Sequence, residues 1–166
     1  MRPWAALGAS SVWYALATAW AATRLPPDGV PLQFDASGAE NRVGARSEAL
    51  TISVVPGVLV LGLGVGLVLL ARYGPLTVMN IPHRSYWLTE EREPEVRRML
   101  AADISLIMSA TLVFLSLIPL WIVLGAEAGG DALSPLLFGA PIGAYVAGLL
   151  IWSVWFGRYR YRPRAE

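Results

Sequence analysis

Long apolar runs alternate along the chain with polar segments rich in arginine and proline. Four runs are long enough to cross a bilayer as helices, which takes about 20 apolar residues at a rise of about 1.5 Å each. None contains Asp, Glu, Lys, Arg or His, and they cover residues 4–23, 50–71, 104–124 and 136–156. A charge at the centre of a membrane helix costs about 2.5–3.5 kcal/mol on insertion scales. The pattern predicts an all-α integral membrane protein with four transmembrane helices in a single membrane domain, residues 1–166.

Composition supports a lipid environment. Of the 166 residues, 55% are hydrophobic and 15% are charged, whereas soluble domains carry about 25% charged residues. The soluble alternative is an all-helical bundle, and the charge-free runs disfavour it. The chain has no cysteine, which excludes disulfides, zinc–thiolate sites and a thiol nucleophile.

The arginines predict the orientation, because cationic segments are retained in the cytoplasm during insertion. All 13 basic residues are Arg, and ten of them lie on the side of the termini and of the loop at residues 72–102. The other side holds three, at Arg24, Arg42 and Arg46. We therefore expect both termini in the cytoplasm and the basic tail, residues 157–166, at the cytoplasmic surface of the membrane. The first apolar run also resembles a signal peptide, and we expect it to be retained as an anchor.

The outer loop, residues 24–49, has the pattern of a small folded cap. Val30, Leu32 and Phe34 alternate with less apolar residues, which is typical of a short strand, and Pro31 would confine that strand to an edge. A turn is expected from Asp35 to Gly38. Ser47 is predicted to cap the second helix. The residues that we expect to carry recognition are Leu25, Pro26, Pro31, Gln33, Phe34, Asp35 and Gly38.

The inner loop, residues 72–102, mixes aromatic and cationic side chains, a composition suited to the headgroup level of a membrane. Pro94 is expected in the first turn of a helix that continues unbroken into the third span, with Asp103 at the membrane boundary. The residues that we expect to contact a partner or lipid headgroups are Asn80, Pro82, His83, Arg84, Tyr86 and Trp87.

Small residues within the spans predict close helix packing. Gly62 with Gly66, and Gly139 with Gly143, each form a G-x-x-x-G pair. The arginines and tyrosines of the tail directly follow a span, so we expect them to hold anionic lipid and not nucleic acid.

Little in the chain predicts catalysis. His83 is the only histidine, so a histidine-based metal or haem site is unavailable. Asp28, Asp35, Glu40 and Glu48 could gather around Ca²⁺, but their spacing matches no known calcium loop, and turn and capping roles account for them. We expect no enzyme activity, no cofactor and no metal.

Two motifs resemble a known family. The segment running from Leu25-Pro26 through Val30-Pro31-Leu32-Gln33-Phe34-Asp35 to Gly38, followed by Gly44, resembles the bacterial membrane domain of unknown function at the N-terminus of SdpI-type toxin immunity proteins. The inner Asn80-Ile81-Pro82 with Tyr86-Trp87-Leu88 is similar to that family as well, and together the motifs span roughly residues 1–125. The family often has His where this chain has Gln33. The resemblance implies an integral membrane protein without known catalysis, and the best-described relative protects against a secreted toxin and sequesters a repressor.

Three functions follow as hypotheses. The first is an envelope sensor or immunity-like module, with residues 25–46 recognising an extracytoplasmic peptide or component and residues 80–100 engaging a cytoplasmic partner. The second is an accessory subunit of a larger membrane complex, a hypothesis that the glycine pairs support. A homo-oligomer is also possible. The third is a small transporter, which would need a more polar path than these spans offer.

Overall fold

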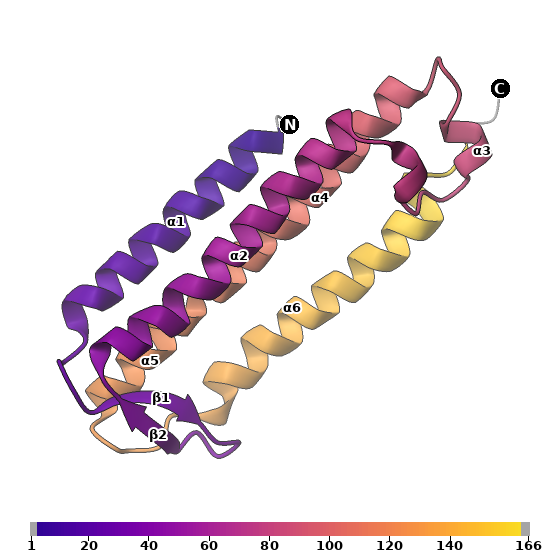
Figure 1. Ribbon diagram of the computed structural model, residues 1–166. Helices are drawn as coiled ribbons and strands as arrows, with labels where there is room; N and C mark the ends of the chain where they lie inside the picture. Colours follow the sequence, from indigo (N-terminus) through magenta and orange to yellow (C-terminus); the bar gives the residue numbers. More distant parts are fainter. Residues whose placement is uncertain (1–2, 164–166) are drawn as a thin grey trace.

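Long helices running along a common direction make up most of the computed structural model, which describes residues 3–163 (Figure 1). Arg2 and Arg164, which contribute to the predicted orientation, lie outside the described residues. In chain order the long helices are α1 (Pro3–Arg24), α2 (Arg46–Tyr73), α4 (Glu93–Leu115), α5 (Leu117–Ala128) and α6 (Pro135–Trp155). The hairpin between α1 and α2 lies at one end of the molecule, and the start of α1 and the end of α6 lie away from it.

Within residues 3–163, three helical segments are long and apolar enough to cross a bilayer: Arg46–Tyr73, Glu93–Ala128 and Pro135–Arg160. The fold is therefore that of an all-α membrane protein. Helix α1 falls outside this group because four aromatic residues with polar ring atoms, together with Ser and Thr, dilute its apolar residues.

A two-stranded antiparallel sheet forms the cap at the hairpin end. Strand β1 (Val30–Phe34) pairs with β2 (Glu40–Gly44), with Val30 opposite Gly44. The turn between them is held by Asp35 and by Gly38, which has a φ of 84°. The strand expected at residues 30–34 is present, but Pro31 is buried and does not lie on an exposed polar face.

The expectation that Ser47 caps the second helix is wrong. Helix α2 begins at Arg46, after Ala45 in an extended conformation, and no side chain caps it. The Arg46 guanidinium instead donates to the carbonyl oxygen of Leu25, with Nε at 2.8 Å. Its backbone N–H donates to the carbonyl of Pro27 at 2.9 Å. The start of α2 is thus fixed by a contact with the end of α1.

The helix that begins in the inner loop runs unbroken into the third span, as expected, and is interrupted further along, at Ser116. Helix α4 starts at Glu93 with Pro94 in its first turn, as predicted, but it ends at Leu115, and α5 begins at Leu117. Pro119 has no N–H to donate to the carbonyl of Leu115, which weakens the helix at this point. The Trp13 indole of α1 donates to Ser116 Oγ at 3.0 Å and so packs at the break.

Three clusters of buried side chains lie along the bundle. The cluster beneath the hairpin joins α1, β1, α2 and α5 through Ala21, Leu25, Val30, Ala49, Ile122 and Val123. The middle cluster is centred on Leu7, Tyr14 and Leu112. The third cluster lies at the opposite end and includes Val68, Trp87, Leu100 and Tyr161.

The glycines that permit close packing are not the predicted ones. At Gly62, Gly66, Gly139 and Gly143 an added Cβ would meet nothing within 4 Å, so these residues make no close contact between helices of the described chain. Gly57 instead lies under the Tyr14 ring, where a Cβ would come within 2.7 Å of Cδ1. Gly64 packs against Met108 in the same manner, with a Cβ distance of 3.0 Å to Cγ.

Short elements close the end opposite the hairpin. They are η1 (Leu76–Val78), α3 (Arg84–Trp87) and η2 (Phe156–Arg160), which continues directly from α6. Arg97 of α4 ties this end together, because its Nη1 donates to the carbonyls of Ala71 at 3.1 Å and Gly74 at 2.8 Å. A cation at these otherwise unpaired carbonyls stabilises the C-terminus of α2.

Candidate functional site

The hairpin cap is attached to the helices at two places beyond its connections along the chain. Leu133, in the loop between α5 and α6, donates its N–H to the carbonyl of Gly38 at 2.9 Å. Gly125 of α5 leaves room for Pro31 and Phe34, since a Cβ there would lie 2.9 Å from Pro31 Cγ. The cap is therefore a folded part of the bundle and not a loose loop.

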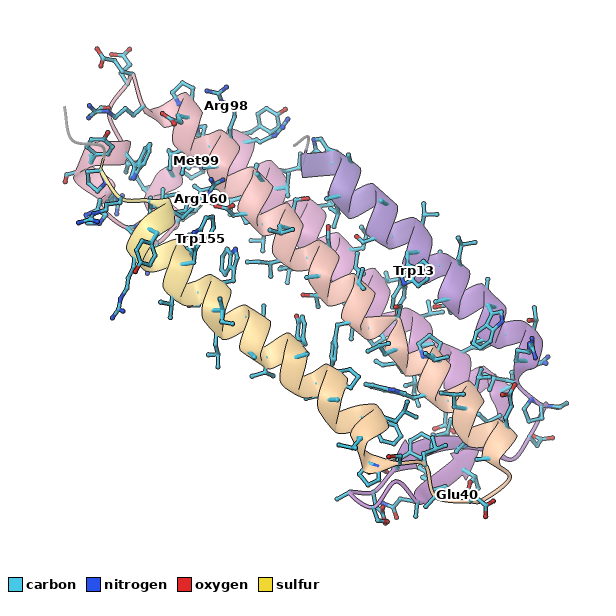
Figure 2. The ribbon with its side chains drawn as sticks, turned by 180° about the vertical axis from the view of Figure 1, so that it is seen from behind. Trp13, Glu40, Arg98, Met99, Trp155 and Arg160 are labelled. Atoms are coloured by element: carbon cyan, nitrogen blue, oxygen red, sulfur yellow. The ribbon has the colours of Figure 1, made fainter. Side chains whose placement is uncertain are left out.

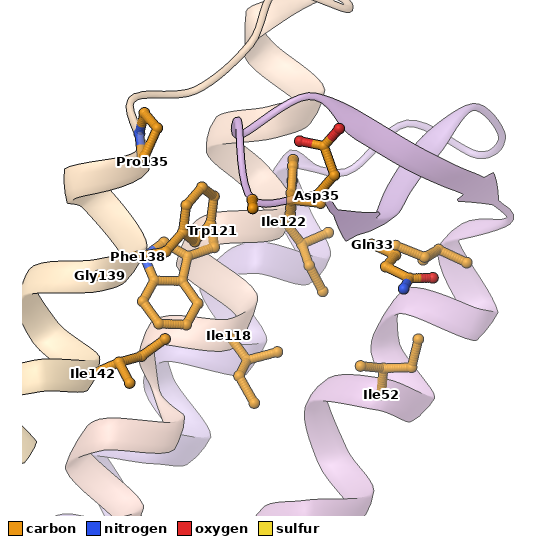
Figure 3. A pocket seen from close by; sticks show the side chains of 13 residues that line it. Gln33, Asp35, Ile52, Ile118, Trp121, Ile122, Pro135, Phe138, Gly139 and Ile142 are labelled. Atoms are coloured by element: carbon orange, nitrogen blue, oxygen red, sulfur yellow. The ribbon is translucent and has the colours of Figure 1, made fainter. Parts of the chain in front are cut away.

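A pocket of about 440 Å³ opens between this cap and the helices (Figure 3). Its apolar walls come from β1, α2, α5 and α6, and the residues that Figure 3 labels on the helices are Ile52, Ile118, Trp121, Ile122, Pro135, Phe138, Gly139 and Ile142. Phe138 bridges the cap and α5, with its ring centroid 5.2 Å from that of Phe34 and 5.2 Å from that of Trp121. Helix α6 therefore forms one wall of the pocket.

Two polar side chains lie at the cap side of the pocket, Gln33 and Asp35. Asp35 Oδ1 accepts hydrogen bonds from the hydroxyl of Ser37 at 2.6 Å, the N–H of Ser37 at 2.8 Å and the N–H of Ala39 at 3.1 Å. These bonds, led by that of the Ser37 hydroxyl, lower the pKa of the exposed Asp35 carboxyl, which stays ionised at neutral pH. The Gln33 side chain is exposed and makes no hydrogen bond within the described residues.

The predicted outer residues divide into two groups. Leu25 and Pro31 are buried and hold the cap in place, Gly38 contacts Leu133, and Pro26 is exposed on the connection to α1. Gln33, Phe34 and Asp35 line the pocket together. Such a pocket can bind the apolar part of a ligand. Gln33 and the Asp35 carboxylate can then contact a polar or cationic group of the same ligand.

The acidic residues of the cap do not form a metal cluster. Among residues 3–163 no three His, Asp or Glu side chains gather in a metal-binding arrangement. Glu48 pairs instead with Arg42 of β2. The calcium alternative considered for Asp28, Asp35, Glu40 and Glu48 therefore has no support from their placement.

The predicted inner residues are likewise divided. Asn80, His83 and Arg84 are exposed, and Pro82 is half-buried. Trp87 is only 2% exposed, and its Nε1 donates to the carbonyl of Tyr161 at 2.9 Å. Tyr86 packs edge-on against Trp87 and lies under the guanidinium of Arg92, 3.9 Å from its ring centroid. Trp87 thus supports the fold and is not available to a partner.

A buried polar cluster at this end was not expected from the sequence. The Tyr161 hydroxyl donates to Asp103 Oδ2 at 2.9 Å, and Arg160 Nε lies 3.3 Å from the same oxygen. Burial, reinforced by the Asp103 charge, raises the pKa of Tyr161 well above 10.0. The cluster joins α4 to the segment after α6. The position of Asp103 at the predicted membrane boundary was the only signal for it.

Sequence reasoning also missed most of the pocket. Ile118, Trp121, Phe138 and Ile142 lie on two helices whose relative placement depends on the break at Ser116 and on the loop at Leu133. For Trp121 the sequence indicates only a place near the end of the third apolar run. Comparison of the chain with protein-family models, curated proteins and solved structures gives no match.

Proposed function

We propose that this protein is a four-span, non-enzymatic module of a bacterial cytoplasmic membrane that senses, or confers immunity to, an extracytoplasmic peptide or envelope component. The pocket between the hairpin cap and α6 is the recognition site, and the exposed residues of the inner loop engage a cytoplasmic partner. The single observation that carries the proposal is the apolar pocket of about 440 Å³ roofed by a folded cap. The resemblance of the cap and inner-loop motifs to SdpI-type immunity proteins supports the same function.

The proposed topology includes α1 as the fourth span. Its 22 residues would reach about 33 Å as a helix, enough for the hydrocarbon core. It lies beside α2 (Figure 1) and presents Val12, Trp13 and Leu16 outward with more than half of each side chain exposed. Exposed apolar side chains of this size along a helix favour contact with lipid.

The distribution of charge supports placing the cap outside. Among the arginines of residues 3–163, three lie at the hairpin end and eight lie at the opposite end of the molecule. The positive-inside rule therefore puts α3 and η2 in the cytoplasm and the pocket on the outer face.

The decisive experiment fills the pocket without disturbing the bundle. Ile142 of α6 lines the pocket and is 44% exposed, whereas Val146, one turn further along α6, is 48% exposed and does not line this pocket. Ile142→Trp is expected to reproduce the phenotype of a gene deletion when cells are challenged with secreted toxins or envelope stress. Val146→Trp is expected to behave as wild type. Unchanged survival and transcription in both the deletion and the Ile142→Trp strain, across a broad panel, would overturn the proposal.

A second function is an accessory subunit of a membrane complex. The observation in its favour is that α6 has no buried residue, so much of the surface of this helix is open to another protein. Copurification in mild detergent distinguishes the two: a stoichiometric membrane partner supports a subunit, and a protein that runs alone at every expression level does not.

A further inference from the structure

The seam between α4 and α6 is not closed by packing. A cavity of about 660 Å³ lies between α1, α4 and α6, and one of about 320 Å³ follows it along the seam between α4 and α6. The two share Leu106, Ala110 and Tyr145. Tyr145 bridges the seam by stacking on Phe114, with centroids 4.3 Å apart, and by a 2.7 Å hydrogen bond to Thr111. On either side of this bridge the seam is open and apolar.

Two buried polar atoms on this seam lack partners. Ser109 Oγ lines the larger cavity, Trp152 Nε1 belongs to a residue lining the smaller one, and neither makes a hydrogen bond among residues 3–163. Ser109 is only 8% exposed. Water is not available in a hydrocarbon environment to satisfy such donors, so each unpaired group costs several kcal/mol. The seam therefore calls for an apolar occupant that carries hydrogen-bond acceptors.

A cation marks one end of the seam. Arg160 reaches α4 by its bond to Asp103, and its guanidinium lies 5.4 Å from the Trp155 ring centroid (Figure 2). Only Nε is used for Asp103, and neither Nη has a hydrogen-bond partner in the described chain. The Arg160 side chain is one-third exposed. Both Nη atoms are thus free to hold an anion at the mouth of the seam.

The order of these groups is the order of groups in a glycerophospholipid. The cation comes first at Arg160, a donor follows about two turns deeper at Trp152, and the apolar cavities extend from there past Tyr145 toward Pro141. We propose that the α4–α6 seam is a binding site for one anionic glycerophospholipid. The phosphate pairs with Arg160, an ester carbonyl accepts the Trp152 N–H, and an acyl chain fills the seam. This inference does not depend on the proposed function.

Two glycines of α6 provide a matched pair of variants. Gly148 lines the smaller cavity, Gly143 lines none, and an added Cβ at either would meet nothing within 4 Å. Gly148→Leu therefore fills the seam with a side chain, while Gly143→Leu adds the same group to the same helix outside it. Trp152→Phe removes the donor and keeps an aromatic ring.

Binding is measured by native mass spectrometry of the full chain released from detergent and titrated with palmitoyl-oleoyl phosphatidylglycerol. We expect one tightly bound lipid in the wild type and in Gly143→Leu, and at least tenfold weaker binding in Gly148→Leu. Trp152→Phe loses one hydrogen bond, which weakens binding by about threefold to tenfold. Phosphatidylcholine with the same chains binds more weakly than phosphatidylglycerol.

Four results would overturn the site. Equal lipid binding by Gly148→Leu and Gly143→Leu would show that no acyl chain lies in the seam. Unchanged binding by Trp152→Phe would show that the Trp152 N–H does not hold an ester carbonyl. Equal binding of the two lipids would show that the site does not select an anionic headgroup, and either result would overturn the assignment. A dimer that excludes lipid would show that a second copy of the chain covers this face.

Discussion

Gly38 offers the sharpest test of how the cap is held against the helices. It has a φ of 84°, and an added Cβ would overlap the carbonyl oxygen of Leu133 and lie 2.8 Å from its carbonyl carbon. Gly29 is the matched control, since its φ is 73° but an added Cβ meets nothing within 4 Å. Both alanine variants incur the cost of a left-handed conformation, about 1–2 kcal/mol. Only Gly38→Ala also forces the cap away from the loop between α5 and α6.

The extra cost follows from the contacts that this displacement breaks. The hydrogen bond from Leu133 to Gly38 contributes about 0.5–1.5 kcal/mol. The contact between Phe34 and Phe138, whose ring centroids are 5.2 Å apart, also contributes about 0.5–1.5 kcal/mol. Gly38→Ala is therefore expected to be less stable than Gly29→Ala by about 1–3 kcal/mol. For a chain of this length the difference corresponds to roughly 2–12 °C in Tm.

Thermal unfolding of both variants in the same detergent, followed by circular dichroism, measures this difference. The expected Tm is highest for the wild type, lower for Gly29→Ala and lowest for Gly38→Ala. Equal Tm values for the two variants would refute the reasoning, because they would mean that the cap does not rest on Leu133.

Three further predictions concern the helices and the buried cluster. Gly57→Ala forces a methyl group against the Tyr14 ring and should lower the free energy of unfolding by about 1–3 kcal/mol, measured by thermal unfolding in detergent. Gly62→Ala should not lower it, because the space around Gly62 is open. Trp13→Phe removes the donor to Ser116 Oγ and should cost about 0.5–1.5 kcal/mol in the same assay. Trp20→Phe should cost less, because the Trp20 indole N–H makes no hydrogen bond among residues 3–163. The third concerns alkaline pH: because folding raises the pKa of Tyr161 above its ordinary 10.0, the stabilisation is complete below pH 10 and is lost as the pH rises from there toward the folded value. Tyr161→Phe should therefore be less stable at neutral pH but should lose less stability than wild type above pH 10, and parallel alkaline melting profiles would contradict this.

The sequence is sufficient to predict the long helices, because a run without charges has few stable conformations other than a helix in lipid. It is also sufficient for β1 and its turn, where alternation and the residues Asp35 and Gly38 act locally. Features that depend on contacts distant in the chain are the ones that it does not reveal. Ser47 has the composition of a cap, but Arg46 reaches a carbonyl 21 residues away and sets the start of α2.

The same reason explains the limits at the site. Trp87 has the character of an interfacial aromatic residue, yet the carbonyl of Tyr161, 74 residues away, accepts its N–H and buries it. The glycine pairs satisfy a known packing motif, but an added Cβ at any of them would meet nothing within 4 Å in the described chain. The pocket requires Phe138 of α6 to meet Phe34 and Trp121, a contact that no local pattern contains.

The side of the membrane on which each end lies is the central claim, and the absence of cysteine from the chain makes it directly measurable. Single-cysteine variants at Ser37, which is exposed in the cap, and at Arg98, which is exposed at the start of α4, are treated in intact cells with a membrane-impermeant maleimide. We predict that Ser37→Cys is labelled at once and that Arg98→Cys is labelled only after the membrane is permeabilised. Labelling of both residues from the same side would contradict the topology and the recognition site proposed from it.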